Sequence, residues 1–150
     1  IPCSGTVGAA RMAADVGIPA IAVSLAYGSK ELRPAAEASA RLAAEALKQG
    51  MSRGAVLNVN LPRGLASEWK KAVLAVPGGR GFALTHKPLD GTGTGADLVF
   101  EPALALAKGP FPAGSDAQAL AEGHVTVTLL GMHGAEAATA RNLESWSFFK

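Results

Sequence analysis

Hydrophobic and polar positions along the first part of the chain follow a helical pattern and then a strand pattern. The small and apolar residues of 5–16 predict a helix, and Gly17 with the pair Ile18-Pro19 predicts its end. The nearly unbroken apolar run of 18–25 predicts a strand buried on both faces, as in parallel sheets. A helix joined to such a strand is typical of the α/β class.

A second helix and a second strand are predicted next. Pro34 suits the first turn of a helix that runs to Gln49, with Gly50 as its stop. The residues expected on its solvent face are Glu37, Arg41 and Glu45, and those expected on its packed face are Leu42, Ala43, Ala46 and Leu47. The alternation in 55–61 predicts a strand that Pro62 ends.

Two asparagines, Asn58 and Asn60, interrupt the apolar residues of the strand at 55–61. They lie toward its carboxyl end, which is the edge where open α/β sheets bind ligands. The alternative is that they only fix the turn that follows the strand. Both interpretations stay open from the sequence.

The pattern loosens over 63–113, where irregular Gly-rich loops separate short apolar stretches. This region is interpreted as a strand near 72–76 and a β-hairpin or extension that projects from the core. Order returns at Ser115 and Asp116, either of which suits the cap of a short helix ending at Glu122. A strand is predicted at 124–130.

The last stretch, 135–150, is predicted to be helical and carries three large aromatic side chains near its end. Such side chains are costly to expose, so we expect them to pack on the core or on a second subunit. They are Trp146, Phe148 and Phe149.

The composition indicates one globular domain, because 150 residues with 49% hydrophobic content can bury a core. The 14 basic residues are scattered among 12 acidic ones, which argues against a nucleic-acid surface. The longest apolar stretch is broken by Gly17 and Pro19 and is too short to cross a membrane. The single cysteine, Cys3, excludes an internal disulfide and fits a reducing compartment, so we expect a cytoplasmic protein.

The candidate chemistry lies at the start of the first helix, in Ser4-Gly5-Thr6. A helix start has backbone N–H groups without partners and a partial positive charge, so it favours a phosphate. The hydroxyls add donors, and glycine lets a ligand approach the backbone closely. The alternative is an ordinary helix start capped by Ser4 or Thr6.

Other kinds of site find less support in the sequence. The phosphate-binding Walker A and Rossmann glycine patterns are absent, and no histidines stand at the spacing of a metal site. A nucleophilic Cys3 would need a positioned base that the sequence does not identify. Because no strand precedes the Ser-Gly-Thr segment, we expect 1–150 to be the C-terminal portion of a single larger α/β domain.

The order of motifs resembles the SurE family of survival-protein nucleotidases. The segments that carry the resemblance are Ser4-Gly-Thr-Val-Gly-Ala-Ala10, Gly17-Ile-Pro-Ala-Ile-Ala-Val-Ser-Leu25, Leu57-Asn-Val-Asn-Leu-Pro62, Gly114-Ser-Asp116 and Leu120-Ala-Glu-Gly-His-Val-Thr-Val-Thr128. The resemblance implies a Rossmann-like parallel sheet flanked by helices, with a protruding β-hairpin and a C-terminal helix. It also implies a homodimer or homotetramer.

The implied activity is metal-dependent hydrolysis of nucleoside monophosphates, as by a 5'/3'-nucleotidase or acid-phosphatase-like phosphomonoesterase. Ser4, Gly5 and Thr6 take the family's phosphate-binding role, and Asn58, Asn60, Ser115 and Asp116 are weaker candidates for support. The family's ligands for Mg²⁺ or Mn²⁺ lie ahead of the phosphate segment, outside this sequence, so no metal ligand or catalytic residue is assigned. Cys3 replaces a usual tyrosine, and Ala117 a usual aromatic residue. The alternative function is a non-catalytic nucleotide- or phosphate-binding or oligomerisation module.

Overall fold

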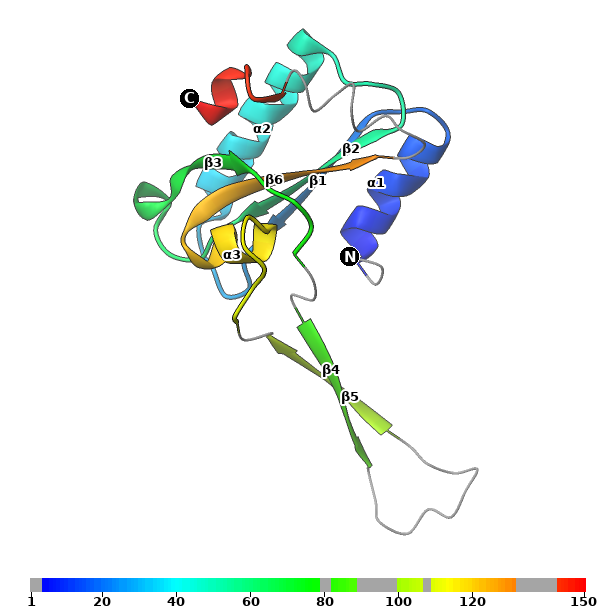
Figure 1. The fold of residues 1–150 in the computed structure, drawn as a ribbon, viewed down its shortest axis with the longest axis vertical. Coiled ribbons are helices and arrows are strands. Elements are labelled where there is room, and N and C mark those ends of the chain that lie inside the picture. Colours follow the sequence, from blue (N-terminus) through cyan, green and yellow to red (C-terminus); the bar gives the residue numbers. More distant parts are fainter. Residues whose placement is uncertain (1–3, 79–81, 89–99, 107–108, 132–142) are drawn as a thin grey trace.

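A computed structural model describes residues 4–78, 82–88, 100–106, 109–131 and 143–150. They form a four-stranded sheet flanked by helices, and a separate two-stranded hairpin (Figure 1). The elements are α1 (Gly5–Asp15), β1 (Ala20–Leu25), α2 (Leu32–Gln49), β2 (Ala55–Leu61), the 3-10 turn η1 (Ala66–Glu68), β3 (Lys70–Leu74), β4 (Phe82–Pro88), β5 (Phe100–Leu106), α3 (Asp116–Ala121), β6 (His124–Gly131) and the 3-10 turn η2 (Ser147–Phe149).

The sheet has the strand order β1-β2-β6-β3 and is mixed in direction. β1 and β2 are parallel, β6 is antiparallel to β2, and β3 is parallel to β6. The connection 62–69 between β2 and β3 is too short for a parallel crossover, which needs about a dozen residues or more. The α/β class is confirmed, because helices flank the sheet. The expectation of a parallel sheet is wrong in part, because β6 runs antiparallel to β2.

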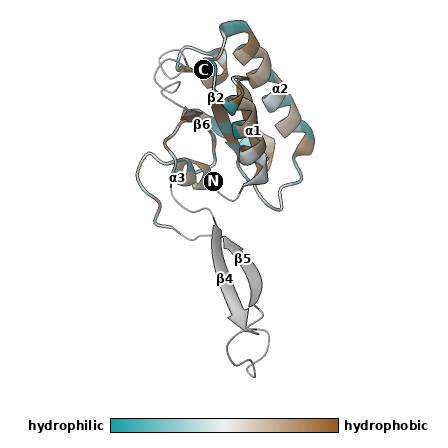
Figure 2. Cartoon of the chain, turned by 90° about the vertical axis from the view of Figure 1, so that its right-hand side faces the viewer, coloured by the Kyte–Doolittle hydropathy of each residue, from teal (hydrophilic) through white to brown (hydrophobic). Residues whose placement is uncertain are grey.

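The core has two layers because successive residues of β2 point to opposite faces of the sheet. Leu57, Val59 and Leu61 pack with the buried side of α2 in one cluster. Val56 packs with α1 in a second, smaller cluster with Val7, Ala10, Ala14, Ala22 and Leu130. Figure 2 shows α2 carrying both hydrophobic and hydrophilic residues along its length, as expected for a helix with one face on a core.

The prediction of the packed side of α2 is wrong at Leu47. The buried residues of this helix are Ala35, Ala38, Leu42 and Ala46, while Leu47 is 87% exposed. Each residue turns the helix by about 100°, which places Leu47 well outside the stripe centred on Leu42. The start near Pro34 and the stop at Gly50, which has a φ of 79°, are confirmed.

The expectation that the first strand is buried on both faces is also wrong. Ala22 is its one buried residue, and the other five residues of β1 are half-buried. β1 is an edge strand of the described sheet, so it has one neighbouring strand instead of two. An apolar run predicts a strand but not its place in the sheet.

The hairpin predicted within 63–113 is confirmed. β4 and β5 pair antiparallel from Phe82 opposite Leu106 to Pro88 opposite Phe100. The hairpin projects away from the sheet (Figure 1). The glycine-rich loop at 90–95 lies outside the described residues.

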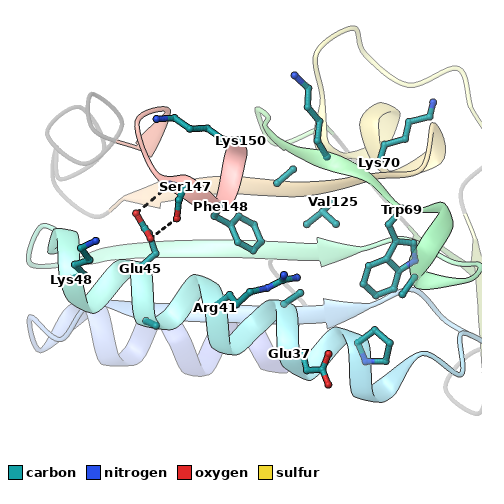
Figure 3. Close-up of a pocket in the computed structure, with 16 residues that line it drawn as sticks. Glu37, Arg41, Glu45, Lys48, Trp69, Lys70, Val125, Ser147, Phe148 and Lys150 are labelled. Atoms are coloured by element: carbon teal, nitrogen blue, oxygen red, sulfur yellow. Dashed lines mark hydrogen bonds between the residues drawn. The ribbon is translucent and has the colours of Figure 1, made fainter.

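The described C-terminus packs on the protein's own core. Trp146 is fully buried, and Phe148 and Phe149 pack against the α2 side of the sheet, which confirms the expected packing of the aromatic residues. The chain ends in the 3-10 turn η2, not in an α-helix that continues to Lys150; the predicted helix at 135–142 lies outside the described residues. Glu45 of α2 accepts hydrogen bonds from Ser147 (Figure 3).

Candidate phosphate-binding site

The first helix begins with a side-chain cap. Ser4 has an extended backbone, with φ −83° and ψ 117°, and its Oγ accepts a hydrogen bond from the backbone N–H of Val7 at 3.2 Å. The Ser4 carbonyl oxygen accepts the first helical bond, from Gly8 N at 2.8 Å. Of the two capping residues expected from the sequence, Ser4 is therefore the cap.

The front of this helix start is accessible. Helix geometry offers no intrahelical acceptor to the N–H groups of Gly5 and Thr6, and both residues are exposed. Apart from its chain neighbours and its own helix backbone, a methyl group built on Gly5 or Gly8 would meet no described atom within 4 Å. Among the described residues, no side chain crowds Gly5 or Gly8, which leaves room for an anion beside the backbone of this first turn.

The start of α1 lies at the carboxyl ends of β1 and β2. A tight turn at Gly17, with φ 84°, joins the end of α1 to the start of β1, so the two elements run in opposite directions. The 11 residues of α1 span about 16 Å and the six of β1 about 20 Å, so Ser4 comes level with the end of β1. In Figure 1 the start of α1 lies on the side of the sheet from which the hairpin projects.

Two polar rows cross the sheet near this end, on the face that α1 covers. The strand register aligns Ser24, Asn60 and Thr126 in one row. It aligns Asn58 and Thr128 with Ala22 in the next. Ala22 packs against α1, and the side chains of alternate residues share a face, which places both rows on the α1 face.

The contacts in these rows bridge strands far apart in the sequence. Asn60 Nδ2 donates to Thr126 Oγ1 at 3.4 Å, and Asn58 is buried. Thr128 Oγ1 is buried and has no hydrogen-bond partner among the described residues. Asn60 therefore bonds across the sheet to β6.

Ser115 and Asp116 hold α3 to the segment after β3. Ser115 Oγ accepts from Gln118 N at 3.2 Å, so Ser115 is the cap of α3 among the two candidates that the sequence offered. Asp116 Oδ1 accepts from Gly78 N at 2.7 Å and from Ala117 N at 2.8 Å. These contacts fix the segment that leaves β3, so both side chains have structural partners in their own chain.

The family model for survival protein SurE matches residues 1–83 of this chain. The chain belongs to the SurE family. It is 36% identical to the 5'-nucleotidase SurE of Geobacter sulfurreducens, over 97% of this chain and 56% of that protein. It is 34% identical to the 5'-nucleotidase SurE of Citrifermentans bemidjiense, over 95% of this chain and 58% of that protein.

The crystal structure of SurE protein from Aquifex aeolicus is similar in fold, with a TM-score of 0.67 and 24% sequence identity. The match covers 95% of this chain and 57% of that one. The chain thus spans a little over half the length of the SurE relatives that it matches.

The described residues of this SurE-family chain do not form a metal site by themselves. Within the described ranges, no three His, Cys, Asp or Glu side chains lie together in a group that could hold an ion. The donors near the start of α1 are hydroxyls and carboxamides, whereas Mg²⁺ sites in proteins usually include one or two carboxylates. Cys3 and His133 lie outside the described residues.

Sequence reasoning missed Ser24, Thr126 and Thr128 as neighbours of the asparagines. A pattern of alternate polar residues at Thr126 and Thr128 is visible in the sequence, but which residues face them depends on strand register.

None of the helices among the described residues is both long enough and apolar enough to cross a bilayer.

Proposed function

We propose that this chain is the C-terminal portion of a metal-dependent nucleotidase that hydrolyses nucleoside monophosphates, and that the start of α1 holds the substrate phosphate. The observation that carries the proposal is the exposed first turn of α1 at the carboxyl ends of β1 and β2, with open space beside Gly5. The curated relatives named 5'-nucleotidase SurE support the choice of reaction.

Each residue of the segment has a separate part in binding. The N–H groups of Gly5 and Thr6 donate to phosphate oxygens, and the Thr6 hydroxyl adds a donor. Ser4 orients the turn through its cap on Val7 and contributes its hydroxyl hydrogen. The helix field adds about 0.3 to 1 kcal/mol for an exposed anion, and up to about 2 kcal/mol when partly buried.

Phosphate binding at a helix start is too weak to account for hydrolysis. The uncatalysed hydrolysis of a phosphate monoester is so slow that enzymes accelerate it by up to ~10²¹-fold, which corresponds to well over 20 kcal/mol. We propose that the dependence on Mg²⁺ or Mn²⁺ arises from ligands in the part of the SurE length that this chain does not cover. No catalytic residue is therefore assigned within the chain.

The polar rows are proposed to support the site from the sheet. Asn60, held by Thr126, and Asn58, in the next row, lie on the face and at the end where the phosphate would sit. Ser115 and Asp116 are proposed to act indirectly, because they fix the segment that leaves β3.

We also propose a cytoplasmic homodimer or homotetramer. Met12, Val16 and Ile18 are large hydrophobic residues that lie exposed near the end of α1 and the start of β1. Clustered apolar exposure of this kind marks protein interaction sites. Light scattering of the intact protein tests the assembly, and a monomer at micromolar concentration would contradict it.

The activity is tested by phosphate release from nucleoside monophosphates by the intact protein, with Mn²⁺ and with a chelator. The expected result is turnover that needs the ion and that falls in Thr6→Val. Arg11→Gln, which removes an exposed α1 side chain away from the first turn, should retain activity. Turnover in chelator, or none with the ion, contradicts the proposal. Nucleotide binding without any turnover would favour the non-catalytic module instead.

A further inference from the structure

A groove of about 630 Å³ lies on the face of the sheet opposite to the α1 start. It is bounded by α2, by the start of β3 and by the C-terminal turn. Its floor includes Ala38, Ala72 and Val125, which belong to the core cluster on the α2 side. The groove is therefore separate from the proposed phosphate site.

Two aromatic rings and one guanidinium dominate the centre of this groove. Figure 3 shows Arg41 extending along α2 between the rings of Phe148 and Trp69. Both rings are half-buried, so each has one part packed on the core and another part open to the groove. The arrangement offers a cation with an apolar surface on either side of it.

The groove is rich in positive charge. Its lining contains five cationic side chains and two carboxylates. Both carboxylates already have partners: Glu37 Oε1 lies 3.2 Å from Arg33 Nε, and Glu45 accepts from Ser147. Within the described residues, Arg41, Lys70 and Lys71 form no ion pair. These cations are available to an anionic partner.

The charge pattern selects the kind of occupant. A second copy that docked groove to groove would place like charges together, which is unfavourable. Glu37 and Glu45 lie one helical turn on either side of Arg41, so they interrupt the track of cations that a nucleic-acid backbone needs. A short peptide can instead place one carboxylate at Arg41 and apolar atoms on the rings.

We propose that this groove docks a short acidic segment of a partner protein, with a carboxylate against Arg41 and an apolar side chain against Trp69 and Phe148. The lysines at the rim, Lys70 and Lys71, attract the remaining acidic side chains and speed the encounter. This interaction does not depend on the proposed hydrolysis, because the two sites lie on opposite faces of the sheet.

The test is fluorescence anisotropy of a labelled, end-blocked pentapeptide, Asp-Glu-Phe-Asp-Glu, titrated with the intact protein. Saturable binding that weakens with salt is expected. Arg41→Gln should weaken it about three- to fivefold, and the triple change Arg41→Gln, Lys70→Gln and Lys71→Gln about tenfold or more. The three side chains are exposed, so unchanged thermal melting should show that the variants fold.

Arg11→Gln is the matched control, because it removes an exposed helical arginine from α1 and should leave peptide affinity unchanged. Equal binding of a Lys-Lys-Phe-Lys-Lys peptide, or unchanged affinity in the triple variant, would overturn the proposal. No binding of the acidic peptide at millimolar concentration would also overturn it. Tighter binding of an eight-residue oligothymidylate than of the peptide would identify a nucleic-acid surface instead.

Discussion

Glu45 of α2 and Ser147 of the C-terminal turn are joined by two hydrogen bonds across 102 positions of the sequence. Glu45 Oε2 accepts from the Ser147 hydroxyl at 2.7 Å, and Oε1 accepts from its backbone N–H at 3.2 Å (Figure 3). The bond from the Ser147 hydroxyl, and after it the bonds from the Gln49 side chain and the Ser147 backbone N–H, lower the pKa of Glu45. The charged carboxylate therefore helps to hold the C-terminal turn against α2.

This link should depend on pH. Because the pKa of Glu45 is lower in the folded than in the unfolded state, its ionised form stabilises the fold at neutral pH, and this contribution is lost as the pH falls below about 4.5. We expect Glu45→Gln to lower the melting temperature at pH 7 more than at pH 3. Circular dichroism melts of both proteins at the two pH values measure this, and an equal difference at both would contradict it.

The contact between Gly78 and Ser115 predicts a position where no side chain fits. A methyl group on Gly78 would lie 2.2 Å from Ser115 Cβ, and the N–H of Gly78 is already bound to Asp116. We expect Gly78→Ala to destabilise the protein by about 1–3 kcal/mol, as overpacking does. Denaturant unfolding measures the loss.

Gly8→Ala is the control for this glycine. Gly8 lies inside α1 and has open space around it, so alanine should stabilise the helix by about 0.5–1 kcal/mol. If Gly78→Ala were as stable as the original protein, the described contact between the β3 exit and α3 would be wrong.

Ser4 has two separable roles, which two substitutions distinguish. Ser4→Ala removes the cap on Val7 and should cost about 0.5–2 kcal/mol of stability. Ser4→Asp keeps a good cap and suits the helix field, but its charge repels a phosphate. We therefore expect Ser4→Asp to melt like the original protein and to raise KM for nucleoside monophosphates at least tenfold. If Ser4→Asp kept the KM of the original protein, the phosphate would bind at another place in the structure.

Local patterns were sufficient to predict most elements of this fold. The strand at Ala55–Leu61 has the predicted bounds, because its alternation and Pro62 define both of its ends. α1 differs from its prediction by one residue, since Gly17 ends it through a positive φ. These features depend on neighbours within a few positions, which a sequence displays directly.

Features that depend on distant neighbours could not be predicted in this way. The direction of β6 and the edge position of β1 follow from which strands pair. The same is true of the candidate site: Asn60 was identified from its strand, but its partner Thr126 lies 66 positions away and requires the register of β2 against β6. The Ser4 cap was predictable, because it involves residues three positions apart.

The most direct measurement of the central claim is an NMR titration of the ¹⁵N-labelled intact protein with a non-hydrolysable phosphonate analogue of a nucleoside monophosphate, in the presence of Mg²⁺. If the first turn of α1 grips the phosphate, the amide resonances of Gly5 and Thr6 move and saturate with the ligand, and those of exposed residues such as Glu37 on α2 stay in place. Saturation of the protein with the analogue while the Gly5 and Thr6 amides remain unshifted would contradict the account.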